Sequence, residues 1–249
     1  MQNRIKTKLR ITIASVLLII SGSMGIILRI ISVDYLLNFN RKYLVSFSSK
    51  LVLKIIGIKI QLPNEIPFNS ENQYFITFNH NSDLDIFALT ALGYTNTVFL
   101  LSDRTLKIVP LTLSAISIGV LYIPEQHKTE KRLDFFKKLE KIAKTKKINI
   151  AGSSEGVHDQ LHGIGNFNKG VYHLTTVCKL DIIPVFIGIP EEINLIKGHE
   201  HLKSGNIKVE ILETIDTQNW ILNDLEKNKD EVRNIYVKKF NEVHKTAIV

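Results

Sequence analysis

The sequence has little cysteine and no repetitive segments. Its 249 residues include one cysteine, Cys178, which excludes an intrachain disulfide framework and any zinc or iron–sulfur site built from several cysteines. There is no internal repeat, no low-complexity tract and no clear linker, so the length suits one domain with a short appendage. With 45% hydrophobic and 22% charged residues, the chain also lacks the composition of a disordered protein.

The positive charge is confined to two segments. The net charge is +8, of which residues 1–10 contribute +4 and residues 126–147 contribute +6, so the remainder carries −2. A basic protein favours acidic partners such as nucleic acid, anionic lipid or phosphorylated ligands. Residues 126–147 have few aromatics and match no nucleic-acid-binding motif. We therefore expect mainly a solvated helix face, open to an anionic membrane or a phosphorylated ligand, and no nucleic-acid partner.

A long uncharged stretch follows the basic N-terminus. Residues 11–28 contain no charged side chain, and a helix of that length spans about 27 Å, close to the hydrocarbon core of a bilayer. A buried core helix is one alternative, and a signal peptide cleaved near Ser21-Gly22-Ser23 is another. Because the apolar run continues to Ile31, longer than a signal peptide needs, we expect residues 1–35 to form a membrane anchor. It would span or half-insert, with its basic end on the cytoplasmic side.

A second apolar segment covers residues 41–57. Lys50 and Lys54 lie four residues apart, on one helical face, and aliphatic residues fill much of the rest. The pattern predicts an amphipathic helix, either at the membrane interface with snorkelling lysines or packed on the core. Gly57 is a C-terminal stop signal, and the alternating residues 58–62 then predict a strand.

The rest of the chain alternates between short strands and helices. This order predicts an α/β fold with a mixed, mainly parallel central sheet flanked by helices. We assign residues 36–215 to the main domain and residues 216–249 to a C-terminal helix that packs on it. Strands are expected at 74–78, 97–101, 119–123, 148–151, 181–188 and 207–215, and helices at 83–92, 106–117, 129–145, 169–179 and 223–245.

A candidate catalytic pair follows the strand at 74–78. His80 lies in the loop after this strand, and Asp85 is five residues further on, where the next helix begins. From the first helical turn, the Asp85 carboxylate can reach one ring nitrogen of His80, fix its tautomer and stabilise the imidazolium. His80 would then be a general base toward a hydroxyl or water. The spacing alone is weak, because a surface histidine beside a helix cap at Asp83 gives the same pattern.

Two other motifs suggest different chemistry. Gly152-Ser153-Ser154-Glu155-Gly156 fits the G-x-S-x-G nucleophile elbow, with Ser154 as nucleophile. The elbow requires a helix immediately afterwards, but glycines follow without an apolar period, and no His-Gly-Gly-Gly oxyanion segment occurs. His158 and His162 are four residues apart but have no evident third ligand, so we expect no metal site.

In their order along the chain, these segments resemble the glycerolipid acyltransferase family typified by 1-acylglycerol-3-phosphate acyltransferase. The family's N-H-x4-D block is matched by Asn79-His80 through Asp85. Its G-x-x-F-I-x-R block is matched in part by Gly119–Glu125, and its F-P-E-G-T-R block only at Glu155 and Gly156. An F-K-x-G-like element matches Phe167–Gly170, and the V-P-V block matches Ile183-Pro184-Val185.

The resemblance implies transfer of a fatty acyl group from acyl-CoA or acyl carrier protein to the hydroxyl of a lysophospholipid or related glycerolipid. His80 would be the general base and Asp85 its partner, and no cofactor is needed beyond the acyl donor. Asn79, Ser82, Glu155, Gly156 and Lys169 would bind substrate. The expected partners are a membrane lipid acceptor, the acyl donor and an anionic membrane surface. The protein would be membrane-bound, with its active site facing the cytoplasm.

The chain departs from the family at two arginines. Glu125 and His158 stand where the family has arginines associated with the acceptor phosphate. Glutamate repels phosphate and a mostly neutral histidine binds it weakly, so we expect an altered acceptor, unless Lys128 or Arg132 supplies the charge. Two alternatives stay open: a serine esterase or thioesterase using Ser154, and a catalytically eroded lipid-binding relative.

Overall fold

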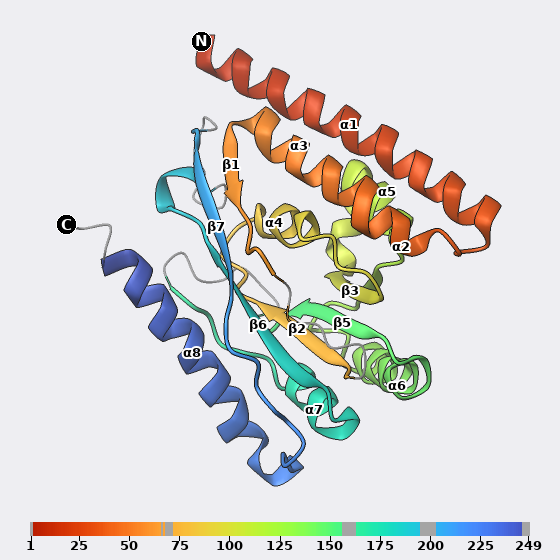
Figure 1. The fold of residues 1–249 in the computed structure, drawn as a ribbon, viewed down its shortest axis with the longest axis vertical. Coiled ribbons are helices and arrows are strands. Elements are labelled where there is room, and N and C mark those ends of the chain that lie inside the picture. The colour runs from red at the N-terminus through yellow and green to blue at the C-terminus, as the bar shows by residue number, and fades with distance from the viewer. Residues whose placement is uncertain (1, 66, 68–71, 156–162, 195–202, 246–249) are drawn as a thin grey trace.

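The central sheet is formed by seven strands among the residues described. The structure, a computed structural model, describes residues 2–65, 67, 72–155, 163–194 and 203–245 (Figure 1). The strands are β1 (Ile58–Gln61), β2 (Tyr74–Phe78), β3 (Thr97–Ser102), β4 (Leu121–Ile123), β5 (Asn149–Ser153), β6 (Asp181–Gly188) and β7 (Gly205–Ile211). Their order is β1-β7-β6-β2-β5-β3-β4, and each neighbouring pair is parallel except β6 and β7. The predicted fold class is confirmed.

The helices also lie close to where the sequence placed them. The α-helices are α1 (Gln2–Ser32), α2 (Leu37–Phe39), α3 (Ser46–Ile56), α4 (Asp85–Ala91), α5 (Val109–Ser117), α6 (Thr129–Lys146), α7 (Lys169–Cys178) and α8 (Leu225–Lys245). A π-helical segment, η1 (Asn40–Val45), precedes α3, and 3₁₀ turns are η2 (Asp103–Lys107), η3 (Glu191–Ile193) and η5 (Leu222–Asp224).

Two strand predictions were too long. The segment predicted as a strand to residue 215 leaves the sheet at Ile211, and Ile215 forms only an isolated bridge with Ile182. The segment predicted from residue 119 enters the sheet at Leu121, because Gly119 has a left-handed backbone with φ of +71°. Both differences concern strand ends, where the alternation of side chains gives no boundary signal.

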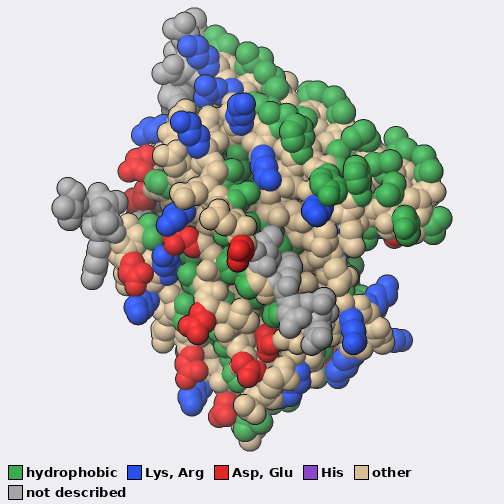
Figure 2. Space-filling view, in the orientation of Figure 1, with side chains coloured by type: hydrophobic (Ala, Val, Ile, Leu, Met, Phe, Trp, Pro, Cys, Tyr) green, Lys and Arg blue, Asp and Glu red, His purple; other side chains and the backbone are tan. Residues whose placement is uncertain are grey.

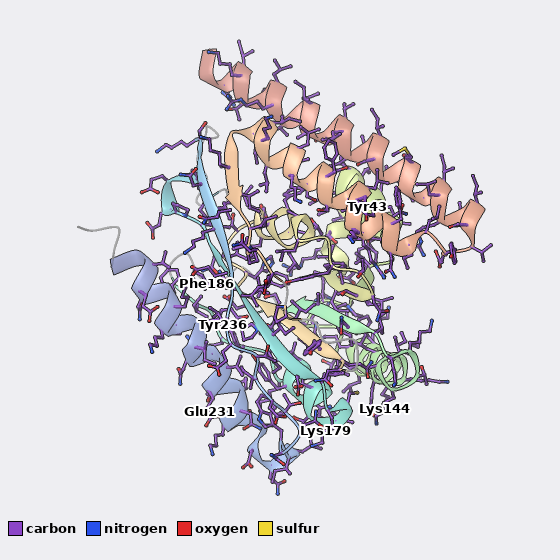
Figure 3. All side chains as sticks on the ribbon, in the orientation of Figure 1. Tyr43, Lys144, Lys179, Phe186, Glu231 and Tyr236 are labelled. Atoms are coloured by element: carbon purple, nitrogen blue, oxygen red, sulfur yellow. The ribbon has the colours of Figure 1, made fainter. Side chains whose placement is uncertain are left out.

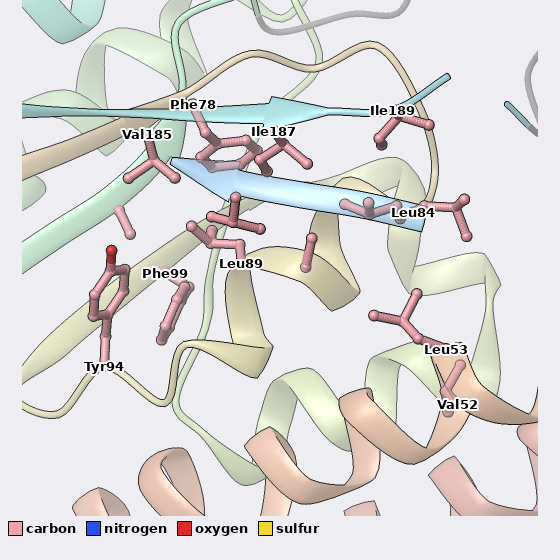
Figure 4. Close-up of a cluster of buried hydrophobic side chains, with 14 of the residues drawn as sticks. Val52, Leu53, Phe78, Leu84, Leu89, Tyr94, Phe99, Val185, Ile187 and Ile189 are labelled. Atoms are coloured by element: carbon pink, nitrogen blue, oxygen red, sulfur yellow. The ribbon is translucent and has the colours of Figure 1, made fainter. Parts of the chain in front are cut away.

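The sheet is buried on both faces by two groups of helices (Figure 1). Along β2, Ile76 and Phe78 pack in a cluster with residues of α1, α3 and α4, part of which Figure 4 shows. Phe75 points to the other face and packs in a cluster with residues of α6, α7 and α8. In Figure 3, Phe186 of β6 and Tyr236 of α8 lie in this second cluster. Burial on both faces explains why these strands read as nearly continuous hydrophobic runs.

Helix α1 packs along α5 and α3 through a stripe of small residues. Ser21 is buried, and a side chain added at Gly22 would lie 2.7 Å from the backbone of Leu113 in α5. One added at Gly25 would lie 2.6 Å from the Cβ atom of Ser117. The small residues around position 22, which suggested a signal-peptide cleavage site, therefore lie within a continuous helix and let α1 approach α5 closely.

The outward side of α1 is apolar. The helix from Arg4 to Ser32 contains a window of mean hydropathy 2.4, which is long and apolar enough to cross a membrane, and only 28% of that window is buried. Figure 2 shows hydrophobic side chains gathered over the C-terminal part of α1 and the adjoining α2 region, with Lys and Arg near the other end of α1. The exposed apolar residues include Val16, Ile20, Met24, Ile27, Ile30 and Ile31.

Helix α3 packs on the core through one face and exposes its lysines on another, so it has features of both predicted alternatives. Val52 and Leu53 are buried in the core, whereas Lys50 and Lys54 are exposed together with Phe47. Tyr43, in the π-helical segment before α3, is also exposed and is labelled in Figure 3. At its end, Gly57 adopts φ of +92°, which reverses the chain into β1 as predicted.

Candidate active site

The candidate base lies at the carboxyl end of a central strand. Strand β2 lies between β6 and β5 and ends at Phe78, so that Asn79 and His80 follow at the sheet edge. The carboxyl ends of parallel strands are the usual location of ligand sites in α/β sheets. Helix α4 begins at Asp85, which places this carboxylate in the first helical turn, as predicted.

His80 and Asp85 form a hydrogen-bonded pair. The Nδ1 atom of His80 lies 3.2 Å from Oδ2 of Asp85, which also accepts a 3.0 Å hydrogen bond from the backbone N–H of Ser82. Asp85 is fully buried, whereas the His80 side chain is 25% exposed. Burial raises the pKa of Asp85, and the hydrogen bond from His80 acts in the opposite direction. Asp85 therefore orients the ring through Nδ1, so a proton-transfer role would fall to Nε2.

A second buried carboxylate holds the backbone of the same loop. Oε1 of Glu155, at the end of β5, accepts a 2.8 Å hydrogen bond from the backbone N–H of His80. Oε2 accepts another of 2.8 Å from the backbone N–H of Gly165. Burial raises the pKa of Glu155. Glu155 thus fixes the position of His80 from inside the protein, and it does not line the cavity described below.

The other sequence-predicted binding residues take different places. The Asn79 side chain bonds both backbone groups of Ile187 in β6, at 2.7 and 3.0 Å. Ser82 is fully buried, and its hydroxyl accepts a hydrogen bond from the N–H of Leu84. Lys169 is exposed at the start of α7 and forms an ion pair with Glu226 of α8. Asn79 and Ser82 therefore shape the His80 loop, Lys169 pairs with α8, and Gly156 falls outside the described residues.

Ser154 is placed poorly for a nucleophile. It is fully buried, with its hydroxyl 2.6 Å from the Thr77 hydroxyl, and it accepts a 3.1 Å hydrogen bond from the Tyr172 hydroxyl. A serine nucleophile requires an exposed hydroxyl bonded to a base. Cys178 is no better suited, because burial raises the pKa of its thiol to about 11.

The described residues hold no cluster of three or more His, Cys, Asp or Glu side chains arranged for a metal ion. His158 and His162, the pair considered as metal ligands, lie outside the described part of the chain.

His80 opens into a large cavity. The cavity has a volume of about 720 Å³ and extends between α1, α3, α4 and α5 on one side and the connection from β4 to α6 on the other. Its apolar part would accommodate an acyl chain, and its polar end would accommodate a charged group. The apolar lining includes Ala14, Leu18, Val45, Val52, Ile56, Leu89, Phe99 and Ala115, and the polar lining includes Arg104, Glu125, Gln126, His127 and Arg132.

The sequence did not predict how α1 contributes to this cavity. We assigned residues 1–35 to an anchor, yet Ala14 and Leu18 are buried against the domain and line the cavity. The signal lay in the spacing of small and apolar residues at positions 14, 18, 22 and 25, one side of a helix. The segment predicted as an anchor therefore forms a wall of the candidate active site.

Comparison with known proteins finds similarity to acyltransferases. The acyltransferase family model matches residues 59–188. A putative 1-acyl-sn-glycerol-3-phosphate acyltransferase of Caenorhabditis elegans is 22% identical over 70% of this chain and 61% of its own length. The human 1-acyl-sn-glycerol-3-phosphate acyltransferase alpha is 20% identical over 76% of this chain and 66% of its own. The matched regions thus span less than two thirds of these relatives.

The fold also has a counterpart among solved structures. The 1-acyl-sn-glycerophosphate (LPA) acyltransferase PlsC of Thermotoga maritima superposes with a TM-score of 0.73 over 98% of this chain and 96% of its own, at 15% identity. This likeness shows a shared fold that includes the N-terminal helices. Because the family model covers more than half of the sequence and includes the His80–Asp85 pair, the chain belongs to the glycerolipid acyltransferase family.

Proposed function

We propose that this protein transfers a fatty acyl group from an acyl thioester, either acyl-CoA or acyl carrier protein, to the hydroxyl of a lysophospholipid or related glycerolipid. The observation that carries the proposal is the His80–Asp85 pair at the opening of a large apolar cavity. A general base must reach the acceptor hydroxyl while the acyl chain is held out of water. The names of the relatives point to the same class of reaction.

The proposed chemical steps use the observed contact between His80 and Asp85. Nδ1 of His80 faces Asp85, so Nε2 takes the proton from the acceptor hydroxyl as its oxygen attacks the thioester carbonyl. The tetrahedral oxyanion collapses, the carbon–sulfur bond breaks, and the thiolate leaves with the proton from the imidazolium. Asp85 stabilises the imidazolium between these steps. These chemical steps need no covalent enzyme intermediate and no cofactor.

The proposal includes attachment to the membrane. The exposed apolar side of α1 would lie in the bilayer, spanning it or inserted in one leaflet (Figure 2). Basic residues before the apolar stretch would remain on the cytoplasmic side. This orientation would put the active site at the cytoplasmic surface, where acyl thioesters and a lysolipid in the membrane would both reach the cavity.

A transfer assay tests the proposal against its alternatives. The purified full-length chain in mixed micelles is given radiolabelled acyl-CoA or acyl carrier protein, with and without lysophospholipid. We expect labelled diacyl lipid only when acceptor is present, and retained activity in Ser154→Ala. Release of free fatty acid that is lost in Ser154→Ala would favour the esterase. Lipid binding without turnover for any donor and acceptor would favour the eroded relative.

A further inference from the structure

The polar end of the cavity carries charges of both signs. Oε2 of Glu125 lies 2.7 Å from Nε of Arg104, and its Oε1 lies 3.3 Å from Nζ of Lys128. Lys128 also pairs with Asp103, at 2.9 Å. Each of the two carboxylates is therefore matched to a cation, and Arg104 and Glu125 line the cavity.

Arg132 is a cation that lines this end of the cavity and interacts electrostatically with Asp103. Its Nη1 donates a 2.7 Å hydrogen bond to the carbonyl oxygen of Pro124, and its guanidinium lies 5.8 Å from the centre of the Phe136 ring. Among the described residues, no carboxylate forms an ion pair with it. Since Pro124 immediately precedes Glu125, the Arg132 cation and the Glu125 anion occupy neighbouring positions on the cavity wall.

The local charge suits one negative charge better than two. Among the described residues, the cluster formed by Arg104, Lys128 and Arg132 with Asp103 and Glu125 has a net charge of +1, and Asp83 lines the same cavity. Near neutral pH a phosphate monoester carries between one and a half and two negative charges, whereas a phosphodiester carries one. Like an ordinary glutamate, Glu125 is ionised near neutral pH, and its hydrogen bond with Arg104 lowers its pKa further. It would repel a phosphate dianion and would accept a hydrogen bond from an ammonium group.

We infer that the acceptor is a lysophospholipid with a phosphodiester headgroup that ends in an ammonium group. Arg132 would bind the phosphate, and Glu125 would accept a hydrogen bond from the ammonium. The inference rests on the proposed acyl transfer and specifies its acceptor. It also gives a role to the glutamate that stands in place of the family's arginine.

Acceptor competition tests the inference. With one acyl donor, kcat/KM is measured for lysophosphatidate, lysophosphatidylethanolamine and lysophosphatidylglycerol of equal chain length. We expect the ethanolamine lipid to be preferred over lysophosphatidate by about tenfold, the size of one charge-assisted hydrogen bond. Glu125→Gln should remove most of this preference, and Arg132→Gln should raise KM for all three lipids. Glu130→Gln, at an exposed position of α6, is the matched control and should change neither quantity.

The outcomes separate this inference from the proposed function. A preference for lysophosphatidate that Glu125→Gln leaves unchanged would overturn the inference, while transfer that depends on His80 would still uphold the reaction. Equal use of the glycerol and ethanolamine lipids would overturn the ammonium contact. If the protein transfers the acyl group neither to these acceptors nor to any other lysolipid, the proposed function is overturned, and the inference with it.

Discussion

Two buried carboxylates hold His80 from different directions. Asp85 bonds the ring, and Glu155 bonds the backbone N–H. Burial raises the pKa of both acids, because desolvation disfavours their charged forms. Two carboxylates whose charged forms are disfavoured by burial therefore contact the same residue, His80. Such an arrangement is expected where the positioning of a base matters more than the stability of the fold.

Replacing Asp85 by Asn tests the ring contact. The amide can no longer stabilise the imidazolium, and it allows the wrong tautomer. We expect kcat to fall by about 10²- to 10⁴-fold with little change in KM. Steady-state kinetics of the wild type and of Asp85→Asn with a fixed acyl donor measure this effect. A kcat within a factor of two of the wild type would contradict the role of Asp85.

The same substitution makes a pH-dependent prediction about stability. Because the pKa of Asp85 is raised in the folded state, folding is favoured by the protonated form. This contribution is complete below about pH 4, the ordinary range of an aspartate, and is lost as the pH rises through the raised folded value. Asp85→Asn should therefore gain stability relative to the wild type between acidic and neutral pH. Urea unfolding in detergent measures this difference, and a constant difference across pH would argue against a raised pKa.

Glu155→Gln tests whether Glu155 positions His80 or touches substrate. An amide offers one acceptor oxygen and places its NH₂ group against the other backbone N–H. The His80 loop should shift, and kcat should fall by about 10- to 100-fold at unchanged lipid KM, since small displacements of a base have effects of this size. A higher KM with normal kcat would instead place Glu155 at the substrate.

At the scale of elements, the contact between α1 and α5 depends on glycine. The site at Gly22 is closed by the backbone of Leu113, which cannot rotate away as a flexible side chain could. Ala14 and Leu18 lie further along the same buried stripe and line the cavity. Packing of α1 is therefore linked to the shape of the cavity.

Gly22→Val should destabilise the folded protein by about 1–3 kcal/mol, the usual cost of overpacking. It should also lower activity with long acyl chains more than with short ones, because α1 forms part of the cavity wall. Met24→Val, on the exposed side of the same helix, controls for helix propensity. Thermal unfolding in detergent and a series of acyl donors measure both effects, and equal stability of the two variants would contradict the close packing.

For the whole molecule, the account predicts how the protein lies on a membrane. Arg4, Lys6 and Lys8 are exposed next to the apolar stretch of α1, so replacing all three by Gln should weaken binding to anionic vesicles by about 1 kcal/mol per charge at low salt. The control variant replaces Lys137, Lys138 and Lys141, which are exposed on α6, and should bind normally. Vesicle flotation measures both variants, and an equal loss in the control would place α6 on the membrane instead.

Much of the fold follows from local sequence patterns. Residues 181–188 form a strand with the predicted bounds because their apolar run ends at Gly188. The His80–Asp85 pair was foreseen because both residues lie within one strand-to-helix connection. The hydrogen bonds of Glu155, which was expected to bind substrate, could not be predicted from its neighbours in sequence. Its partners, the backbone N–H groups of His80 and Gly165, come from other parts of the chain. The ion pair between Arg104 and Glu125 likewise joins residues 21 positions apart, and no periodicity predicts it.

The central claim is that His80 is the base of an acyl transfer. The most direct measurement compares initial rates of lipid acylation by His80→Ala and His173→Ala, the latter at an exposed histidine of α7, with the wild type in one micelle preparation. The account predicts that His80→Ala loses at least about 10²-fold in kcat while still binding lysolipid, and that His173→Ala keeps full activity. Normal acyl transfer by His80→Ala would contradict it.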